Sequence, residues 1–240
     1  MRLPRLYAPA EAQLLKVQFA QSDAWQSQVQ TPTALFDAVA DWLAQEIKAR
    51  PVQLHAWSLT PEALLMLATP PDSDALSGLV QSIGRRLGAT LRSGGVFAGR
   101  YKSALVESDR VLATQIWVEQ APQRNGYVAN AVDWAWSSAG LHTGIVPVPR
   151  PWVMPLSDHP GYWGCGNTPF ARQAAYQAKL TAGLSNTDRR DIEAAVAGQW
   201  ALGSEAYLAK ISKLASRRVK PGKRGRPAKL NPNDMARIRP

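Results

Sequence analysis

The stretch PVQLHAWSLTPEALLMLAT, residues 51–69, contains two apolar runs on either side of a short Thr-Pro-Glu turn. The first run, PVQLHAWSL, predicts a strand over 51–59 with Leu54 and Ala56 on the same face. The second run, Ala63–Thr69, ends at two prolines, which break the pattern. Two short strands around a tight connection predict a β-hairpin.

Further strands and helices flank this hairpin on both sides. The expected order is a strand over 12–20, a helix opening at Thr31-Pro32, the hairpin, a helix capped by Ser73 or Asp74, a strand over 100–106, and a helix from Ser108 or Asp109 to about Gln120. This β-α-β-β-α-β-α order is typical of a ferredoxin-like α+β domain, in which an antiparallel sheet carries helices on one face.

The chain divides into three expected regions. Residues 1–125 form the ferredoxin-like domain. Residues 126–215 form a loop-rich C-terminal extension with three short helices, predicted from about 170 to 182, from Asn186 or Thr187 to about 197, and over 205–214. Residues 216–240 form a basic tail without apolar periodicity, which we expect to be disordered when free.

Positive charge is concentrated at the C-terminal end. The 240 residues include 28 Lys and Arg and 18 Asp and Glu, which gives a net charge of +10. Residues 206–240 contribute eleven basic side chains and one acidic side chain, so the first 205 residues are neutral overall. A neutral body with a basic end indicates a polyanionic partner.

The composition also excludes several classes of protein. The single cysteine, Cys165, excludes an internal disulfide framework and a cysteine-based metal cluster. No apolar run approaches the ~18 residues needed to span a bilayer, and the N-terminus lacks the apolar stretch of a signal peptide. We therefore expect a cytoplasmic protein without membrane contact.

The tail contains the run Lys223-Arg224-Gly225-Arg226-Pro227, which Lys220 and Lys229 extend. A Gly between two Arg, followed by Pro, gives an extended segment that fits the narrow minor groove of A·T-rich DNA. The run resembles an AT-hook. The alternative is a basic tail that increases solubility and has no groove specificity, and both interpretations predict salt-sensitive binding to polyanions.

A second group of basic residues lies in the body, near the predicted second helix and the strand that follows it. Its members are Arg85, Arg86, Arg92, Arg100 and Lys102. They could contact a phosphate backbone, or they could form an ordinary solvated face. His55, His142 and His159 have no metal-ligand spacing, and we expect His55 to be a structural residue. Residue types and spacing alone predict no catalytic constellation.

Six stretches of the chain form a family pattern. They are LHAWSLTP (Leu54–Pro61), LSGLVQSIGRRL (Leu76–Leu87), GRYKSALVESD (Gly99–Asp109), VDWAWSSAGLH (Val132–His142), TPFARQAAYQAKL (Thr168–Leu180) and WALGSEAYLAKI (Trp200–Ile211). Together with the basic C-terminus, they resemble the REP-associated tyrosine transposases, a bacterial branch of the single-tyrosine HUH transposases. The resemblance implies a nucleoid-associated protein with a ferredoxin-like domain that binds short palindromic DNA hairpins.

The resemblance also implies an active site. In the family, a His-X-His pair holds a divalent metal such as magnesium, and a tyrosine attacks the scissile phosphate to form a 5′-phosphotyrosine link. The matching positions here are Ala63, Leu65 and Trp117, and Ala121 replaces an Asn of the family pattern. Alanine and leucine cannot ligate a metal, and tryptophan has no hydroxyl. We therefore expect neither a metal cofactor nor strand cleavage.

Other residues could in principle rebuild such a site. Tyr101 and Tyr127 are the alternative hydroxyl groups, and Glu62, Glu119 and His55 are candidates for a different carboxylate site. The leading hypothesis is a catalytically inactive, transposase-like protein that binds hairpin or otherwise structured DNA. The alternatives are an active transposase or single-strand endonuclease with a rearranged site, and an interaction module that partners an active homologue or a second copy of itself.

Overall fold

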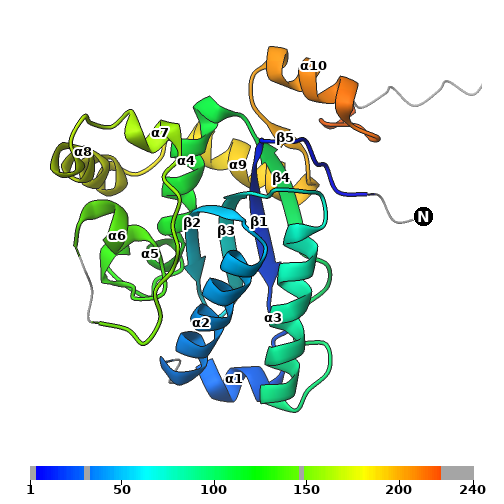
Figure 1. Cartoon of the computed structure of the whole chain (residues 1–240), viewed down its shortest axis with the longest axis vertical. Helices are drawn as coiled ribbons and strands as arrows, with labels where there is room; N and C mark the ends of the chain where they lie inside the picture. The colour runs from blue at the N-terminus through cyan, green and yellow to red at the C-terminus, as the bar shows by residue number, and fades with distance from the viewer. Residues whose placement is uncertain (1–3, 30–32, 146–148, 223–240) are drawn as a thin grey trace, which may run out of the picture.

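A five-stranded sheet forms the centre of the protein (Figure 1). The computed structural model describes residues 4–29, 33–145 and 149–222. The strands, in spatial order, are β2 (Gln53–Leu59), β3 (Ala63–Thr69), β1 (Ala12–Gln18), β4 (Lys102–Val106) and β5 (Ala201–Leu202). Their pairings are antiparallel except that β5 adds to β4 in parallel. The first four strands confirm the predicted α+β arrangement, whereas the two-residue β5 was not predicted.

Helices cover both faces of this sheet, rather than the single face that the sequence predicted. Helices α2 (Thr33–Ala49) and α3 (Ala75–Leu91) pack on one face. Helices α4 (Ser108–Glu119) and α9 (Asn186–Gly198) pack on the opposite face. Successive strand side chains point to opposite faces, and β3 is buried at nearly every position, so both faces of the sheet need cover.

A β-bulge in β2 changes the predicted facing of that strand. The register with β3 shifts between Leu54 and Ala56, which makes His55 the extra residue. Leu54 and Trp57 belong to the core under α2 and α3, whereas Ala56 belongs to the core under α4 and α9. The prediction that Leu54 and Ala56 share a face is therefore wrong, because strict alternation holds only in a strand without a bulge.

The remaining helices include two of the three that were predicted in the extension, the third being α9. They are α1 (Asp23–Val29), α5 (Ala121–Arg124), a 3₁₀ turn (Ala131–Asp133), α6 (Ala139–Thr143), α7 (Pro160–Trp163), α8 (Pro169–Ala182) and α10 (Glu205–Leu214). Helices α8, α9 and α10 confirm the prediction, and the side chains of Thr168, Ser185 and Ser204 cap their first turns. No helix in the described part of the chain is long and apolar enough to cross a lipid bilayer.

The last described residues pack onto the body. Val219 is buried, and its carbonyl oxygen accepts a hydrogen bond from the Ala201 amide at 2.9 Å. The Lys220 ammonium lies 2.5 Å from a carboxylate oxygen of Glu205. The prediction of a disordered segment from residue 216 onward is therefore wrong for Val219 and Lys220, because an apolar side chain and a backbone hydrogen bond anchor them.

Candidate nucleic-acid interface

The three positions that the resemblance matches to metal ligands and a nucleophile lie together in the structure. Ala63 and Leu65 are alternate residues of β3, so both side chains point to the face that α4 and α9 cover. There they pack in one apolar cluster with Trp117 of α4. Each of the three is 4% exposed. Two segments far apart in the sequence therefore form a single site, and its surface is apolar.

A cleft of about 360 Å³ opens beside this apolar surface. Its charged lining consists of Lys16, Lys102, Arg124, Glu62 and Glu193. The Arg124 guanidinium lies 4.6 Å from the centre of the Trp117 ring, and its Nη1 donates to the Trp117 carbonyl oxygen at 3.0 Å. Burial lowers the pKa of Arg124 to about 10, so this side chain is still charged at neutral pH.

Three donors hold Glu62 at the rim of the cleft. Thr60 Oγ1 and Asn125 Nδ2 each donate to Glu62 Oε2 at 2.9 Å, and the Tyr127 hydroxyl donates to Glu62 Oε1. Burial, together with this carboxylate, raises the pKa of Tyr127. Tyr127 is therefore a protonated phenol at neutral pH, whereas a tyrosine nucleophile reacts as the phenolate.

Tyr101, the other alternative hydroxyl, lies on the opposite side of the sheet. Its side chain is 7% exposed and belongs to the core under α2 and α3. The Arg5 guanidinium stacks 3.5 Å from the centre of its ring, and burial raises the pKa of Tyr101. The sheet therefore separates Tyr101 from the cluster that contains Trp117.

The replaced site does not fit a divalent metal. Ala63 and Leu65 offer no donor atom, and the Lys16 and Lys102 ammonium groups belong to the same cleft. Nowhere in residues 4–29, 33–145 and 149–222 are three His, Cys, Asp or Glu side chains grouped so that they could hold a metal ion. The residues present therefore disagree with the metal that the resemblance implies.

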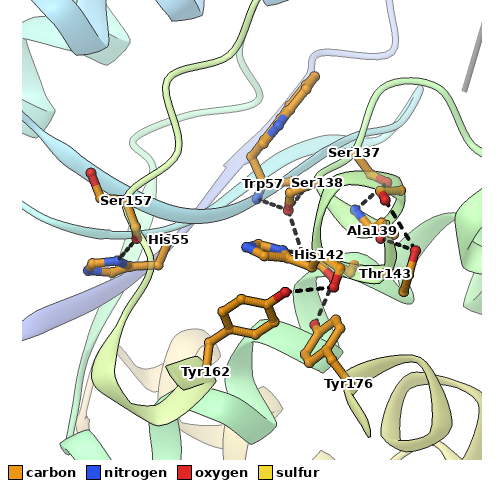
Figure 2. A network of polar contacts seen from close by, with 12 residues as sticks. His55, Trp57, Ser137, Ser138, Ala139, His142, Thr143, Ser157, Tyr162 and Tyr176 are labelled. Atoms are coloured by element: carbon orange, nitrogen blue, oxygen red, sulfur yellow. Dashed lines mark hydrogen bonds and ion pairs between the residues drawn. The ribbon is translucent and has the colours of Figure 1, made fainter. Parts of the chain in front are cut away.

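Glu119 belongs to a separate buried network. Its Oε1 accepts hydrogen bonds from Ser138 Oγ and His142 Nδ1, each at 2.5 Å, and its Oε2 accepts one from the Tyr176 hydroxyl at 2.6 Å. The Tyr162 hydroxyl donates to the His142 carbonyl oxygen at 2.7 Å. Figure 2 shows Ser138, His142, Tyr162 and Tyr176 close together within this network. The network joins α4, α6, α7 and α8 and leaves Glu119 fully buried.

His55 has its hydrogen-bond partners outside the Glu119 network. Its Nδ1 donates to the Ser157 carbonyl oxygen at 2.7 Å, a contact visible in Figure 2, and its Nε2 accepts from Thr69 Oγ1 at 2.9 Å. Burial lowers the pKa of His55 to about 4, so the ring is neutral at pH 7. The prediction of a structural His55 is confirmed. The predicted alternative of a combined site of His55, Glu62 and Glu119 is wrong, because each of the three residues has its own, separate hydrogen-bond partners.

The predicted basic group of the body is divided between several environments. Arg85 and Arg100 line a second cleft, of about 570 Å³, and Arg5 joins them from the N-terminal segment. Arg86 instead lies 3.6 Å from a carboxylate oxygen of Glu46. Lys102 belongs to the cleft beside Trp117, on the other side of the sheet. These residues therefore do not form a single patch, because Arg100 lies in the bend before β4, Lys102 lies on the face of β4 that α4 and α9 cover, and Arg86 is ion-paired with Glu46.

The arginine cleft has no carboxylate among its described lining residues. Its walls combine the three arginines, Arg5, Arg85 and Arg100, with apolar side chains such as Val80 and Phe97. Both Arg85 and Arg100 are exposed. No local sequence pattern indicates Arg5, because only the tertiary fold brings the N-terminal segment beside α3.

Most of the predicted tail contacts lie outside the described residues. They are Lys223, Arg224, Gly225, Arg226, Pro227 and Lys229. Lys220 is described, and its ion pair with Glu205 joins it to the first turn of α10. Lys220 would have to leave Glu205 before it could contact DNA.

A comparison with solved structures supports this fold. No protein-family model and no curated protein matches the sequence. Among solved structures, the chain is similar to a REP-associated tyrosine transposase bound to a REP hairpin, with a TM-score of 0.51 and 17% sequence identity. The likeness covers 66% of this chain and 94% of that chain. At this identity the likeness shows the fold: an open, mixed α+β sheet of the kind found in a tyrosine transposase.

Proposed function

We propose that this protein is a transposase-like DNA-binding protein that binds hairpin or otherwise structured DNA and does not cut it. We place this protein in the bacterial cytoplasm, at the nucleoid. The solved transposase of similar fold is bound to a REP hairpin, which makes a DNA hairpin the first ligand to test. The neutral body and basic C-terminal end also favour a polyanionic partner.

The observation that carries the binding half of the proposal is the arginine cleft. Arg5, Arg85 and Arg100 line one cleft, with no carboxylate among its described lining residues. The Arg5 guanidinium stacks on Tyr101 and donates to its carbonyl oxygen, whereas Arg85 and Arg100 are exposed. Guanidinium groups match the geometry of phosphate oxygens and donate charge-assisted hydrogen bonds to them. An exposed concave surface of one sign of charge also raises the local concentration of an anionic ligand.

The absence of cutting is supported by the apolar cluster of Ala63, Leu65 and Trp117. The positions that the resemblance matches to the metal ligands and to the nucleophile pack against one another. Tyr101 is on the wrong side of the sheet, and Tyr127 donates its hydroxyl to Glu62. Among the described residues, neither tyrosine therefore lies in this cleft as a free phenolate.

An electrophoretic shift assay over a series of salt concentrations tests the binding. The ligands are REP-type hairpin DNA and unrelated duplex DNA of the same length. We expect both to bind at low salt, with the hairpin more resistant to added salt, because phosphate contacts alone are sequence-independent and salt-sensitive. A protein that shifts neither DNA at low salt contradicts the proposal.

Truncation after Gly222 tests the contribution of the tail. The removed residues 223–240 carry six basic side chains and one acidic one. We expect weaker binding to every DNA by a similar factor. The slope of log affinity against log salt should also flatten by about one unit for each phosphate that the tail neutralises. Since the cut leaves Val219 in place, the fold should be intact. Weaker binding confined to A·T-rich duplex would instead indicate minor-groove recognition by an AT-hook.

A second candidate function is a protein-interaction module. Phe170, in the first turn of α8, is 84% exposed, and Trp163, at the end of α7, is 54% exposed. Aromatic side chains are enriched at protein interfaces. The partner would be an active homologue or a second copy of this chain. Light scattering after size-exclusion chromatography, with and without such a homologue, distinguishes the candidates: a stable complex without DNA affinity favours the module.

A further inference from the structure

Two lysines face each other directly across neighbouring strands beside the replaced site. In the antiparallel pairing of β1 with β4, Lys16 is opposite Lys102. On its other side, Lys16 is opposite Leu65 of β3. Leu65, Lys16 and Lys102 therefore form one row across the sheet, on the face covered by α4 and α9. The next row on this face, Leu67, Leu14 and Ala104, is entirely apolar.

This lysine pair is costly for the folded protein when nothing is bound. Like charges directly opposite each other in a sheet are destabilising, and both lysines are partly buried. Burial lowers the pKa of Lys16, and the nearby Lys102 and Arg124 lower it further. Among the described residues, neither lysine has a carboxylate within ion-pairing distance. An anion that entered the cleft would remove this repulsion.

The carboxylates that line the cleft only partly offset its cations. Glu62 already accepts hydrogen bonds from Thr60, Asn125 and Tyr127 at the rim. Glu193 is exposed on α9 and acts on Lys16 from beyond ion-pairing distance. Arg124 is held in place by Trp117, so its charge is ordered before any ligand arrives. The described lining of the cleft thus contains three cations and two carboxylates. One of these carboxylates, Glu62, already accepts hydrogen bonds from other residues.

We propose that Lys16, Lys102 and Arg124 hold a phosphate group of bound DNA in this cleft without a divalent metal. The inference rests on the proposed function, and it identifies the ligand of the replaced site. Where the family pattern would place a cation between histidines, this chain has Ala63 and Leu65, with Lys16 directly opposite Leu65. The site has changed from one that holds a cation to one that holds an anion. No bond is made or broken there.

The shape and chemistry of the cleft favour a phosphodiester as the occupant. Its volume of about 360 Å³ exceeds what a single inorganic phosphate fills, and its floor is the apolar surface of Ala63, Leu65 and Trp117. A sugar can pack on such a floor while its phosphate meets the ammonium groups. A free phosphate would use the same cations, so the experiment must separate the two sources.

The test compares two double variants that lose the same charge. Lys16→Gln/Lys102→Gln removes the pair in the cleft, and Lys48→Gln/Lys179→Gln removes two exposed lysines from α2 and α8. Affinity for a fluorescent hairpin DNA is measured by anisotropy, in EDTA and in magnesium. We expect wild type to bind at least as tightly in EDTA as in magnesium, because the site needs no metal and magnesium competes with the lysines for phosphates. We expect the cleft variant to bind about tenfold more weakly or worse, and the control variant to change about twofold.

A second measurement separates a binding role from a structural one. Without DNA, Lys16→Met should raise the thermal midpoint by a few degrees, because it removes the like-charge contact and buries apolar surface. The same variant should bind DNA more weakly, so stability and affinity should move in opposite directions. A variant that loses both thermal stability and DNA affinity would show that Lys16 has only a structural role. That result overturns the inference.

The outcomes also separate this inference from the proposed function. If wild type binds the hairpin and both double variants bind alike, the cleft holds no phosphate, although DNA binding stands. Binding that disappears in EDTA contradicts a metal-free site. If wild type binds no DNA but shows lysine-dependent binding of inorganic phosphate by calorimetry, the ligand is a free phosphate and the proposed function fails as well.

Discussion

Replacement of Glu119 by Gln is expected to lower the free energy of unfolding by about 1–3 kcal/mol, the cost of a disrupted buried hydrogen bond. Glu119 is fully buried and accepts hydrogen bonds from Ser138, His142 and Tyr176. A glutamine has nearly the same volume, but its amide nitrogen must face at least one of these donors. One of these buried groups must therefore turn from donor to acceptor or lose its partner, and either change weakens the network. The loss is a large part of the 5–15 kcal/mol that stabilises a typical domain.

Urea denaturation measured by far-ultraviolet circular dichroism checks this prediction. Glu193→Gln is the matched control, because Glu193 is exposed on α9 and has no hydrogen bond to lose among the described residues. We expect the control to change the free energy of unfolding by less than about 0.5 kcal/mol. The network joins α4, α6 and α8, so the variant should also open these helices to proteolysis first. A loss below about 1 kcal/mol for Glu119→Gln would mean that the network does not hold the extension onto the domain.

The double variant Arg85→Gln/Arg100→Gln is expected to weaken hairpin binding by about 100-fold. Each guanidinium that reaches a phosphate makes charge-assisted hydrogen bonds, which contribute about 1.5–3 kcal/mol apiece. Both side chains are exposed and line the same cleft, so their removal should leave the fold unchanged. The salt dependence should also flatten by about two units of slope if each arginine neutralises one phosphate.

The control for this variant is Arg92→Gln/Arg190→Gln. Arg92 ends α3 and Arg190 lies on α9, both are exposed, and neither lines the arginine cleft. Anisotropy titrations of the two double variants with the same hairpin compare equal losses of charge. Equal weakening by both would show that net charge alone holds DNA, and the arginine cleft would lose its assigned role.

Much of the fold is predictable from local patterns. The apolar runs at 51–59 and 63–69 predict the β2–β3 hairpin, and hydroxyl residues before apolar periodicity predict the beginnings of α8 and α10. The β-bulge at His55 has no comparable signal, because it depends on how β2 meets β3. The two-residue β5 is too short for any periodicity, and only its neighbour β4 makes it a strand.

The candidate sites are less predictable because they depend on tertiary structure. Residue spacing alone does not link Ala63 to Trp117; the family resemblance suggested the link, and the packing of α4 on β3 supplies it. Lys16 and Lys102 become neighbours only through the register of β1 with β4. The same holds for Arg5, whose position beside Arg100 depends on where the N-terminal segment crosses the body.

The central claim is that this protein holds DNA without cutting it, and one assay tests both halves. Wild-type protein is incubated with hairpin DNA labelled at its 5′ and 3′ ends, in magnesium, in manganese and in EDTA. One half of each sample is run on a native gel, and the other is denatured to reveal nicks and covalent protein–DNA adducts. The account predicts a shifted complex in all three buffers, at least as strong in EDTA as with either metal, with intact DNA and no adduct. A metal-dependent nick with a covalent protein–DNA product, or no shifted complex at all, would contradict it.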